Sequence, residues 1–321
     1  MRSPKFRLDT ASLPKTKPTA SHLSMKSWPG ALLLTRQSSP IYPSCHGKSS
    51  SRTYSWLPSN IFTVHRADGR IRALIQQRGD EIAGIMKARR TQTNVPERCA
   101  TLLPLLARLP QPLALLEVGA SAGLCLLPDY YAYLYDAHFV PSARRSAAPP
   151  PTLACRTSLG TPLPVRGIEV GWRAGLDSAP IDIYDDDQIA WLEALIWPGE
   201  PDRLANLRAS LAIARREPPR ILRGDLRVDL VQLAAEAPRD ATLVVFHTAV
   251  LAYIESREDR AAFARTVREI GAIWVSNEAP GLFPEISAKA SRPGPPHHLL
   301  LSLDAEPIAW TDLHGASIEW L

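Results

Sequence analysis

One short segment of the chain combines an acid, a serine and two glycines at the spacing of a ligand-binding turn. The apolar run 113–116 leads into Glu117, and Gly119, Ser121 and Gly123 follow at every second position. A strand that ends in such a turn exposes backbone N–H groups, and glycines let a ligand approach the main chain closely. We therefore expect a phosphate, a carboxylate or the edge of a nucleotide to lie against this turn.

Two chemistries fit the same residues. Glu117-x-Gly119-x-Ser121-x-Gly123 is typical of a Rossmann-like nucleotide or S-adenosylmethionine site, with Ser121 where a middle glycine often stands. Gly119-Ala-Ser121-Ala-Gly123 also reads G-x-S-x-G, the nucleophile elbow of α/β-hydrolases. A tight turn that binds nothing is the third interpretation. The elbow of a hydrolase comes after several strands, whereas this turn follows the first convincing strand, which favours the Rossmann-like interpretation.

Other predicted strands also end in polar side chains. These strands cover residues 169–177, 220–224, 241–248 and 272–276, and the polar residues at their carboxyl ends are Asp177, Asp225, His247, Asn277 and Glu278. Ligands of an open parallel sheet bind beyond the carboxyl ends of its strands. The sequence therefore predicts one site that gathers these residues beside the glycine turn, and a small molecule as its partner.

Two of these residues have a specific role and a structural alternative. Asp177 ends the second predicted strand, where an acid commonly binds ribose hydroxyls, although it lies far beyond Gly123 and a surface turn also explains it. The long gap predicts a β-rich insertion at about 130–166. We expect His247 to accept a proton from an attacking hydroxyl or amine, and the alternative is a histidine bonded to a neighbouring strand or loop.

A polar loop, Thr91–Asn94, separates two predicted helices, 71–89 and 97–109. Pro104 is expected to kink or split the second of these helices. The functional interpretation is a lid that lowers Arg90 and Asn94 onto the ligand. The alternative is helix capping by Thr93 or Asn94.

The net charge of +5 does not indicate a nucleic-acid protein, because it comes from the first 60 residues. Residues 1–60 carry nine Lys and Arg and one acid, whereas the remainder carries 28 basic and 31 acidic residues. A polyanion-binding enzyme is expected to show its basic patch on the folded domain. Residues 1–60 are rich in Ser and Pro, and we expect a disordered extension or a start site placed too far upstream.

The four cysteines are widely spaced and form no C-x-x-C pair, so neither a zinc site nor a disulfide framework is expected. No apolar run approaches the ~18 residues of a membrane span, and no secretory signal is present. We expect a cytoplasmic protein with no metal site and no contact with a membrane.

The predicted fold class is α/β, with a Rossmann-like open, mostly parallel sheet and an antiparallel C-terminal edge. A helical segment, 61–111, is expected to precede a Rossmann-like domain over 112–321.

Several segments resemble an uncharacterised bacterial family, number twenty-three thirty-two of the domains of unknown function, which is common in actinobacteria. They are residues 88–94, 116–124, 175–182, 223–225, 244–247, 274–278 and 310–315, with Trp320-Leu321 at the end. The resemblance runs from about residue 62 to the C-terminus, and this family has no established activity.

The chain more distantly resembles class I S-adenosylmethionine-dependent methyltransferases. Glu117, Gly119 and Gly123 match their opening motif, and Ser121 departs from it. The resemblance implies that S-adenosylmethionine is the cofactor and that Glu117 and the turn amides hold its polar end. It also implies that Asp177 binds the ribose hydroxyls and that Asp225 accepts a hydrogen bond from the adenine amino group.

Two alternatives remain open. One is a serine hydrolase with Ser121 as nucleophile, His297, His298 or His314 as base and Glu278 as the acid. The other is a Rossmann-like binding protein without catalytic activity.

Overall fold

The computed structural model describes residues 53–55, 63–65, 70–197 and 199–321. Most of the predicted extension, 1–60, therefore lies outside the described residues. Near the end of this extension the structure describes strand β1 (Thr53–Ser55), which pairs antiparallel with β2 (Thr63–His65).

One eleven-stranded sheet organises the rest of the described chain, in the order β5-β4-β6-β13-β12-β11-β10-β9-β3-β7-β8. Five neighbouring strands at one end of the sheet pair in parallel: β3 (Leu113–Val118), β7 (Val170–Asp177), β8 (Arg220–Arg223), β9 (Thr242–Thr248) and β10 (Ile273–Glu278). In chain order they stand 3-2-1-4-5 across the sheet, which is the order of a Rossmann-like fold. The predicted fold class is confirmed, and the strand order reverses between β3 and β9.

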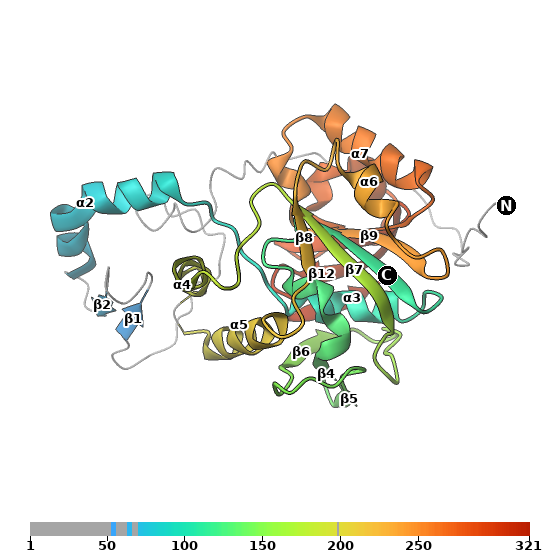
Figure 1. Ribbon diagram of the computed structural model, residues 1–321, viewed down its shortest axis with the longest axis horizontal. Coiled ribbons are helices and arrows are strands. Elements are labelled where there is room, and N and C mark those ends of the chain that lie inside the picture. The colour runs from blue at the N-terminus through green and yellow to red at the C-terminus, as the bar shows by residue number, and fades with distance from the viewer. Residues whose placement is uncertain (1–52, 56–62, 66–69, 198) are drawn as a thin grey trace.

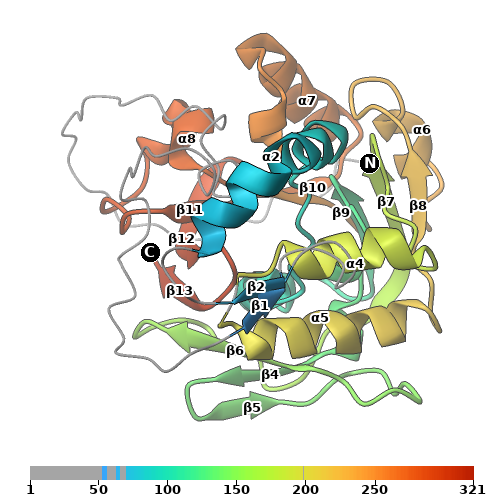
Figure 2. The same ribbon diagram turned by 90° about the vertical axis from the view of Figure 1, so that its left-hand side faces the viewer.

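The antiparallel edge continues the sheet beyond β10. It consists of β11 (His298–Leu303), β12 (Glu306–Asp312) and β13 (Ser317–Trp320). Three strands from the region of the predicted insertion then extend it further: β6 (Thr152–Thr157), β4 (Ala132–Tyr135) and β5 (His138–Val140). Figure 2 shows them in this order beyond β13. Residues far apart in the chain thus complete a single sheet.

Helices cover both faces of the sheet (Figure 1). The first face packs against α3 (Arg98–Leu106), α4 (Asp186–Ala194), α5 (Pro201–Ala214) and the short 3-10 helices η2 (Leu124–Leu126) and η3 (Pro128–Tyr130). The second face packs against α6 (Leu230–Ala234), α7 (Arg257–Glu269), α8 (Pro284–Ser287) and the short helices η4 (Leu251–Tyr253) and η5 (Pro280–Leu282). Side chains alternate along β3, so that Leu113 and Leu115 face α3 while Leu116 and Val118 face α7. Glu117 therefore lies on the α3 face.

Before the sheet the chain forms α2 (Arg70–Ala88) and then α3. Pro104 was expected to kink or split the second helix, but α3 runs through it as one buried helix. Proline has no N–H for the carbonyl of Ala100, and the Tyr135 hydroxyl donates to that carbonyl at 2.8 Å instead. Among the described residues, no helix has both the length and the apolar composition that a membrane crossing requires.

Candidate functional site

The glycine turn after β3 has the backbone conformation that its sequence indicates. Gly119, Ser121 and Gly123 have φ angles of 75°, 55° and 72°. A Cβ on Gly119 would lie 2.2 Å from Val250 Cγ2, and one on Gly123 would lie 2.6 Å from Pro219 Cγ. Both glycines are therefore required by backbone conformation and by close packing. Ser121 is a non-glycine residue held in the left-handed region, a kind of strain that clusters at functional sites.

Most of the N–H groups of this turn are bonded within the protein. Gly119 N donates to Leu176 O at 2.8 Å, Ser121 N donates to Asp177 Oδ2 at 2.7 Å, and Leu124 N donates to Asn94 Oδ1 at 2.9 Å. The element that follows is the single turn η2 and not a long helix, and Pro128 begins the next 3-10 helix, η3. Side chains are therefore the main groups that this edge offers a ligand.

Asp177 joins the ends of β7 and β3. Its Oδ2 accepts from Ser121 N, and its Oδ1 accepts from Ala179 N at 2.8 Å. Gln92 Nε2 lies 3.5 Å from both oxygens and donates to Ala179 O at 3.0 Å. A carboxylate has about four acceptor positions, so Asp177 keeps acceptor capacity beyond its two short bonds.

Glu117 is a buried carboxyl group at the end of β3. It is 2% exposed, and its Oε2 has no hydrogen-bond partner among the described residues. Burial raises the pKa of Glu117 well above its usual range, and the nearby Arg98 opposes the shift only in part. The shift favours the protonated form, in which the carboxyl group can donate as well as accept a hydrogen bond.

Arg98 is the charged residue that sequence reasoning missed. Its guanidinium is almost fully buried and donates from Nε to Leu313 O at 3.0 Å and from Nη1 to Thr248 O at 3.0 Å and Thr248 Oγ1 at 3.2 Å. Burial lowers the pKa of Arg98, although a guanidinium stays charged in proteins. The available signal was its position directly before the apolar run 99–106, where a lone arginine would be buried with the helix.

Asn277 lies at the end of β10 on the same face as Arg98. It pairs with Thr248 across the β9–β10 ladder and is 0% exposed. The hydroxyl of Thr311 donates to Asn277 Oδ1 at 2.8 Å, and Nδ2 has no partner among the described residues. The amide therefore presents an unused donor beside the Arg98–Thr248 contact.

Unpartnered polar atoms concentrate at this edge of the sheet. Six buried side-chain atoms of the described residues lack a hydrogen bond: Glu117 Oε2, Ser121 Oγ, Ser210 Oγ, Arg260 Nε, Asn277 Nδ2 and Glu278 Oε2. Four of the six belong to the ends of β3 and β10 or to the turn after β3. Buried polar groups are normally bonded, so this concentration marks the edge as the candidate site.

His247 lies on the opposite face of the sheet from Glu117, among aromatic side chains. Its Nδ1 lies 2.8 Å from Glu278 Oε1, and its Nε2 accepts from Trp274 Nε1 at 2.9 Å. This pattern assigns the Nδ1–H tautomer. Both ring nitrogens are held, as in the structural alternative predicted for this residue, and proton transfer by His247 stays a prediction.

Glu278 holds the loop after β9. Its Oε1 also accepts from Val250 N at 2.9 Å and Leu251 N at 3.0 Å. Glu278, whose Oε2 has no hydrogen-bond partner among the described residues, lines a cavity of about 10 Å³ together with the hydroxyl-bearing residues Ser276 and Ser302. That volume suits one water molecule.

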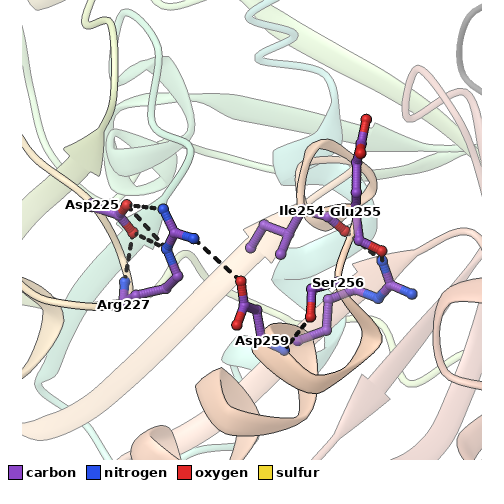
Figure 3. Close-up of polar contacts among 7 residues, drawn as sticks. Asp225, Arg227, Ile254, Glu255, Ser256 and Asp259 are labelled. Carbon is purple, nitrogen blue, oxygen red and sulfur yellow. Dashed lines mark hydrogen bonds and ion pairs between the residues drawn. The ribbon is translucent and has the colours of Figure 1, made fainter.

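Asp225 lies at the rim, after β8, and is partly exposed. Figure 3 shows its carboxylate against the Arg227 guanidinium, which also reaches Asp259 Oδ2 at 3.2 Å, while Ser256 caps α7. The side-chain bond from Arg227 lowers the pKa of Asp225. The structure therefore places Asp225 beside the edge but outside the buried polar group.

The loop predicted to act as a lid does lie across the strand ends. Trp191 Nε1 donates to Arg90 O at 3.0 Å, Tyr253 Oη donates to Thr91 O at 3.1 Å, and Asn94 Nδ2 donates to Ala120 O at 3.3 Å. Arg90 thus contributes its backbone, and its side chain is exposed.

Two further features bear on the hydrolase alternative and on metal binding. Burial, together with the charges of Arg203 and Arg98, lowers the pKa of His314 to about 3. Within the described residues no histidine hydrogen-bonds Ser121 Oγ, and no group of three or more His, Cys, Asp or Glu is placed to hold a metal ion.

The fold and this edge define an α/β protein with a Rossmann-like sheet and a buried polar site at the switch point of its strands. The chain belongs to the family described as "Uncharacterized protein conserved in bacteria (DUF2332)", whose model matches residues 49–320. The predicted family is confirmed, and the match begins earlier than the expected residue 62. No curated protein and no solved structure matches the chain.

Proposed function

We propose that the protein is a S-adenosylmethionine-dependent methyltransferase-like enzyme that acts on a small molecule at the carboxyl edge of the sheet. The observation that carries the proposal is the position of Glu117: an acid with an unpartnered Oε2, two residues before a left-handed glycine turn, next to the switch point of a 3-2-1-4-5 sheet.

The acceptor groups at this edge fit the cofactor. Glu117 Oε2 is free to bind an amino group, and Asp177 keeps acceptor positions for ribose hydroxyls. Asp225 would accept from an adenine amino group by exchanging part of its contact with Arg227. When bound, the cofactor supplies an electrophilic methyl group on a sulfonium.

The protein's own contribution is alignment and the exclusion of water. Alignment of a nucleophile with a reacting centre in a dry pocket provides a large part of a rate enhancement and needs little acid–base chemistry. The segment 90–97 covers the strand ends, and Asn94 holds the turn from above through Ala120 O and Leu124 N. His247 is not required for this chemistry, since both its ring nitrogens are bonded.

Isothermal titration of the full chain with S-adenosylmethionine tests the proposal. We expect saturable binding that Glu117→Gln weakens at least about tenfold, the equivalent of the loss of one hydrogen bond of about 1.4 kcal/mol. The matched control is Glu217→Gln, which changes an exposed glutamate, and it should bind as the wild type does. No detectable binding at millimolar cofactor would overturn the proposal.

A serine hydrolase is the second candidate, because Ser121 combines a φ of 55° with a buried and unpartnered Oγ. Labelling with a fluorophosphonate separates the two functions. The methyltransferase proposal expects no labelling, whereas labelling that disappears in Ser121→Ala would establish the hydrolase. A binding protein without activity would take up S-adenosylmethionine and transfer no methyl group.

A further inference from the structure

We propose that Arg98 and Asn277 form a binding site for a carboxylate group of the substrate, at the ends of β9 and β10. The inference rests on the proposed function in one respect, namely that the site binds the substrate and not the cofactor. The site itself is carried by the contacts of these two side chains.

Arg98 forms no ion pair within the described residues, although the buried acids Glu117 and Glu278 lie near enough to act on its charge. Its three hydrogen bonds go to neutral oxygens, two carbonyls and the hydroxyl of Thr248. Its Nη2 also makes no hydrogen bond to a described residue. A buried cation that lacks a paired anion is destabilising, and such a residue is retained where a ligand supplies the negative charge.

Asn277 provides a second donor at the same place. Thr248 is bonded to Arg98 Nη1 and is the cross-strand partner of Asn277, and neighbouring side chains on one face of a sheet lie about 5 Å apart. The Thr311 hydroxyl fixes Asn277 Oδ1, so the unpartnered Nδ2 is the free group. A guanidinium and a buried amide donor therefore lie near the end of the β9–β10 pair.

A carboxylate is the anion that matches these donors. It is planar and offers two oxygens, which suits one guanidinium N–H and one amide N–H. The residues around it are closely packed, with Asn277 and Thr311 both 0% exposed, which disfavours the larger and doubly charged phosphate. A cation is disfavoured because both free groups are donors.

The position of the site assigns the carboxylate to the substrate. The proposed cofactor groups lie at the ends of β3, β7 and β8, whereas Arg98 and Asn277 act at the ends of β9 and β10, on the other side of the switch point. Glu117 on β3 stands between the two sets and faces the same side of the sheet as Arg98. Substrate and cofactor would thus meet at Glu117.

Thermal unfolding of the full chain in acetate, phosphate or chloride at equal ionic strength and pH 7 tests the site. We expect acetate, and not phosphate, to raise the unfolding temperature by about 2–4 °C over chloride, because an anion that binds the folded state stabilises it. Arg98→Met should remove the increment. The matched control, Arg216→Met, changes an exposed arginine and should keep it.

Asn277→Asp provides a second, isosteric variant. It places a carboxylate of the protein beside Arg98, so the unfolding temperature in chloride should rise while the acetate increment disappears. An increment that persists in Asn277→Asp, the absence of an increment in the wild type, or a larger effect of phosphate would each overturn the carboxylate site.

Titration with S-adenosylmethionine separates this inference from the proposed function. An acetate increment that persists without any cofactor binding would overturn the proposed function and leave the carboxylate site standing. An increment that saturating S-adenosylmethionine abolishes would overturn the assignment to the substrate, because the cofactor's own carboxylate would then occupy the site.

Discussion

Asn94 and Leu124 are joined across the carboxyl edge of the sheet, with the Asn94 Oδ1 accepting from the Leu124 N at 2.9 Å. The same side chain donates from Nδ2 to Ala120 O, so a residue that precedes the sheet holds both ends of the glycine turn. Asn94 is not the N-cap of α3, a position that Glu97 occupies. Its contacts therefore couple the covering segment 90–97 to the turn where we propose that the ligand binds.

Asn94→Ala should weaken binding of S-adenosylmethionine severalfold and lower the free energy of unfolding by no more than about 1–2 kcal/mol, the cost of losing a cap-like side chain. Asn94→Asp keeps the acceptor for Leu124 N and loses the donor to Ala120 O, so it should lie between alanine and wild type. Calorimetric titration and urea unfolding measure the two effects. A large loss of stability with unchanged affinity would show that Asn94 serves the fold alone.

The pKa of Glu117 determines a second prediction. Burial raises this pKa in the folded chain above its unfolded value, so the folded state holds a proton that the unfolded state releases. The stability of the wild type should therefore fall as pH rises from about 4.3 through the folded pKa. Glu117→Gln has no such proton and should be more stable than wild type at pH 8, with the difference closing near pH 4.

Urea unfolding of both proteins at pH 4.5, 6 and 8 gives the comparison. Glu217→Gln, at an exposed position, should show no pH-dependent difference from wild type. If Glu117→Gln is less stable at pH 8 than wild type, Glu117 is ionised and paired in the folded protein.

Local patterns account for the parts of the fold that could be predicted. The apolar run before Glu117 indicated β3, and the glycines indicated a turn with left-handed residues, because both depend on neighbours in sequence. The alternation of strands and helices indicated the open, mostly parallel sheet, whereas its strand order is known only from the structure. The polar partners could not be predicted in the same way: Arg98 bonds Leu313 and Thr248, which lie 215 and 150 residues further along the chain.

His247 and Asp225 differ in how far their hydrogen-bond partners could be predicted from sequence. The carboxyl-end position of His247 predicted a place in the site, but its face of the strand and its bond to Trp274 depend on how β9 and β10 pair. Asp225 has Arg227 only two residues on, and that neighbour was a local signal for an ion pair at the rim.

His314 predicts acid sensitivity. Its pKa is lowered to about 3 in the folded chain, first by burial and then by Arg203 and Arg98, while the unfolded value is about 6.5. The unfolded state binds the extra proton between these values, so stability should fall as pH decreases from about 6.5 toward 3. Urea unfolding of His314→Gln should show a smaller loss of stability between about pH 6.5 and about pH 3 than the wild type shows. An unchanged loss of stability would show that His314 is accessible to protons in the folded state.

The glycine turn offers a prediction that separates backbone strain from packing. Gly119→Ala places a Cβ at a φ of 75° and within 2.2 Å of Val250 Cγ2, whereas Gly271 has a similar φ of 73° and nothing within 4 Å of the new atom. Gly271→Ala should therefore cost only the left-handed backbone penalty, about 1–2 kcal/mol. Gly119→Ala should cost more, because the side chain of the partly buried Val250 must also move.

Val250→Ala supplies the rescue. In the Gly119→Ala background it removes the methyl groups that clash, so the double variant should recover toward the cost of Gly271→Ala, and a double-mutant cycle in urea should give a coupling of about 1 kcal/mol or more. Additive effects would mean that the turn relaxes by a backbone movement and that Val250 does not constrain it. Recovery of stability would show that the loop after β9 closes against Gly119, which joins the two strands on either side of the switch point.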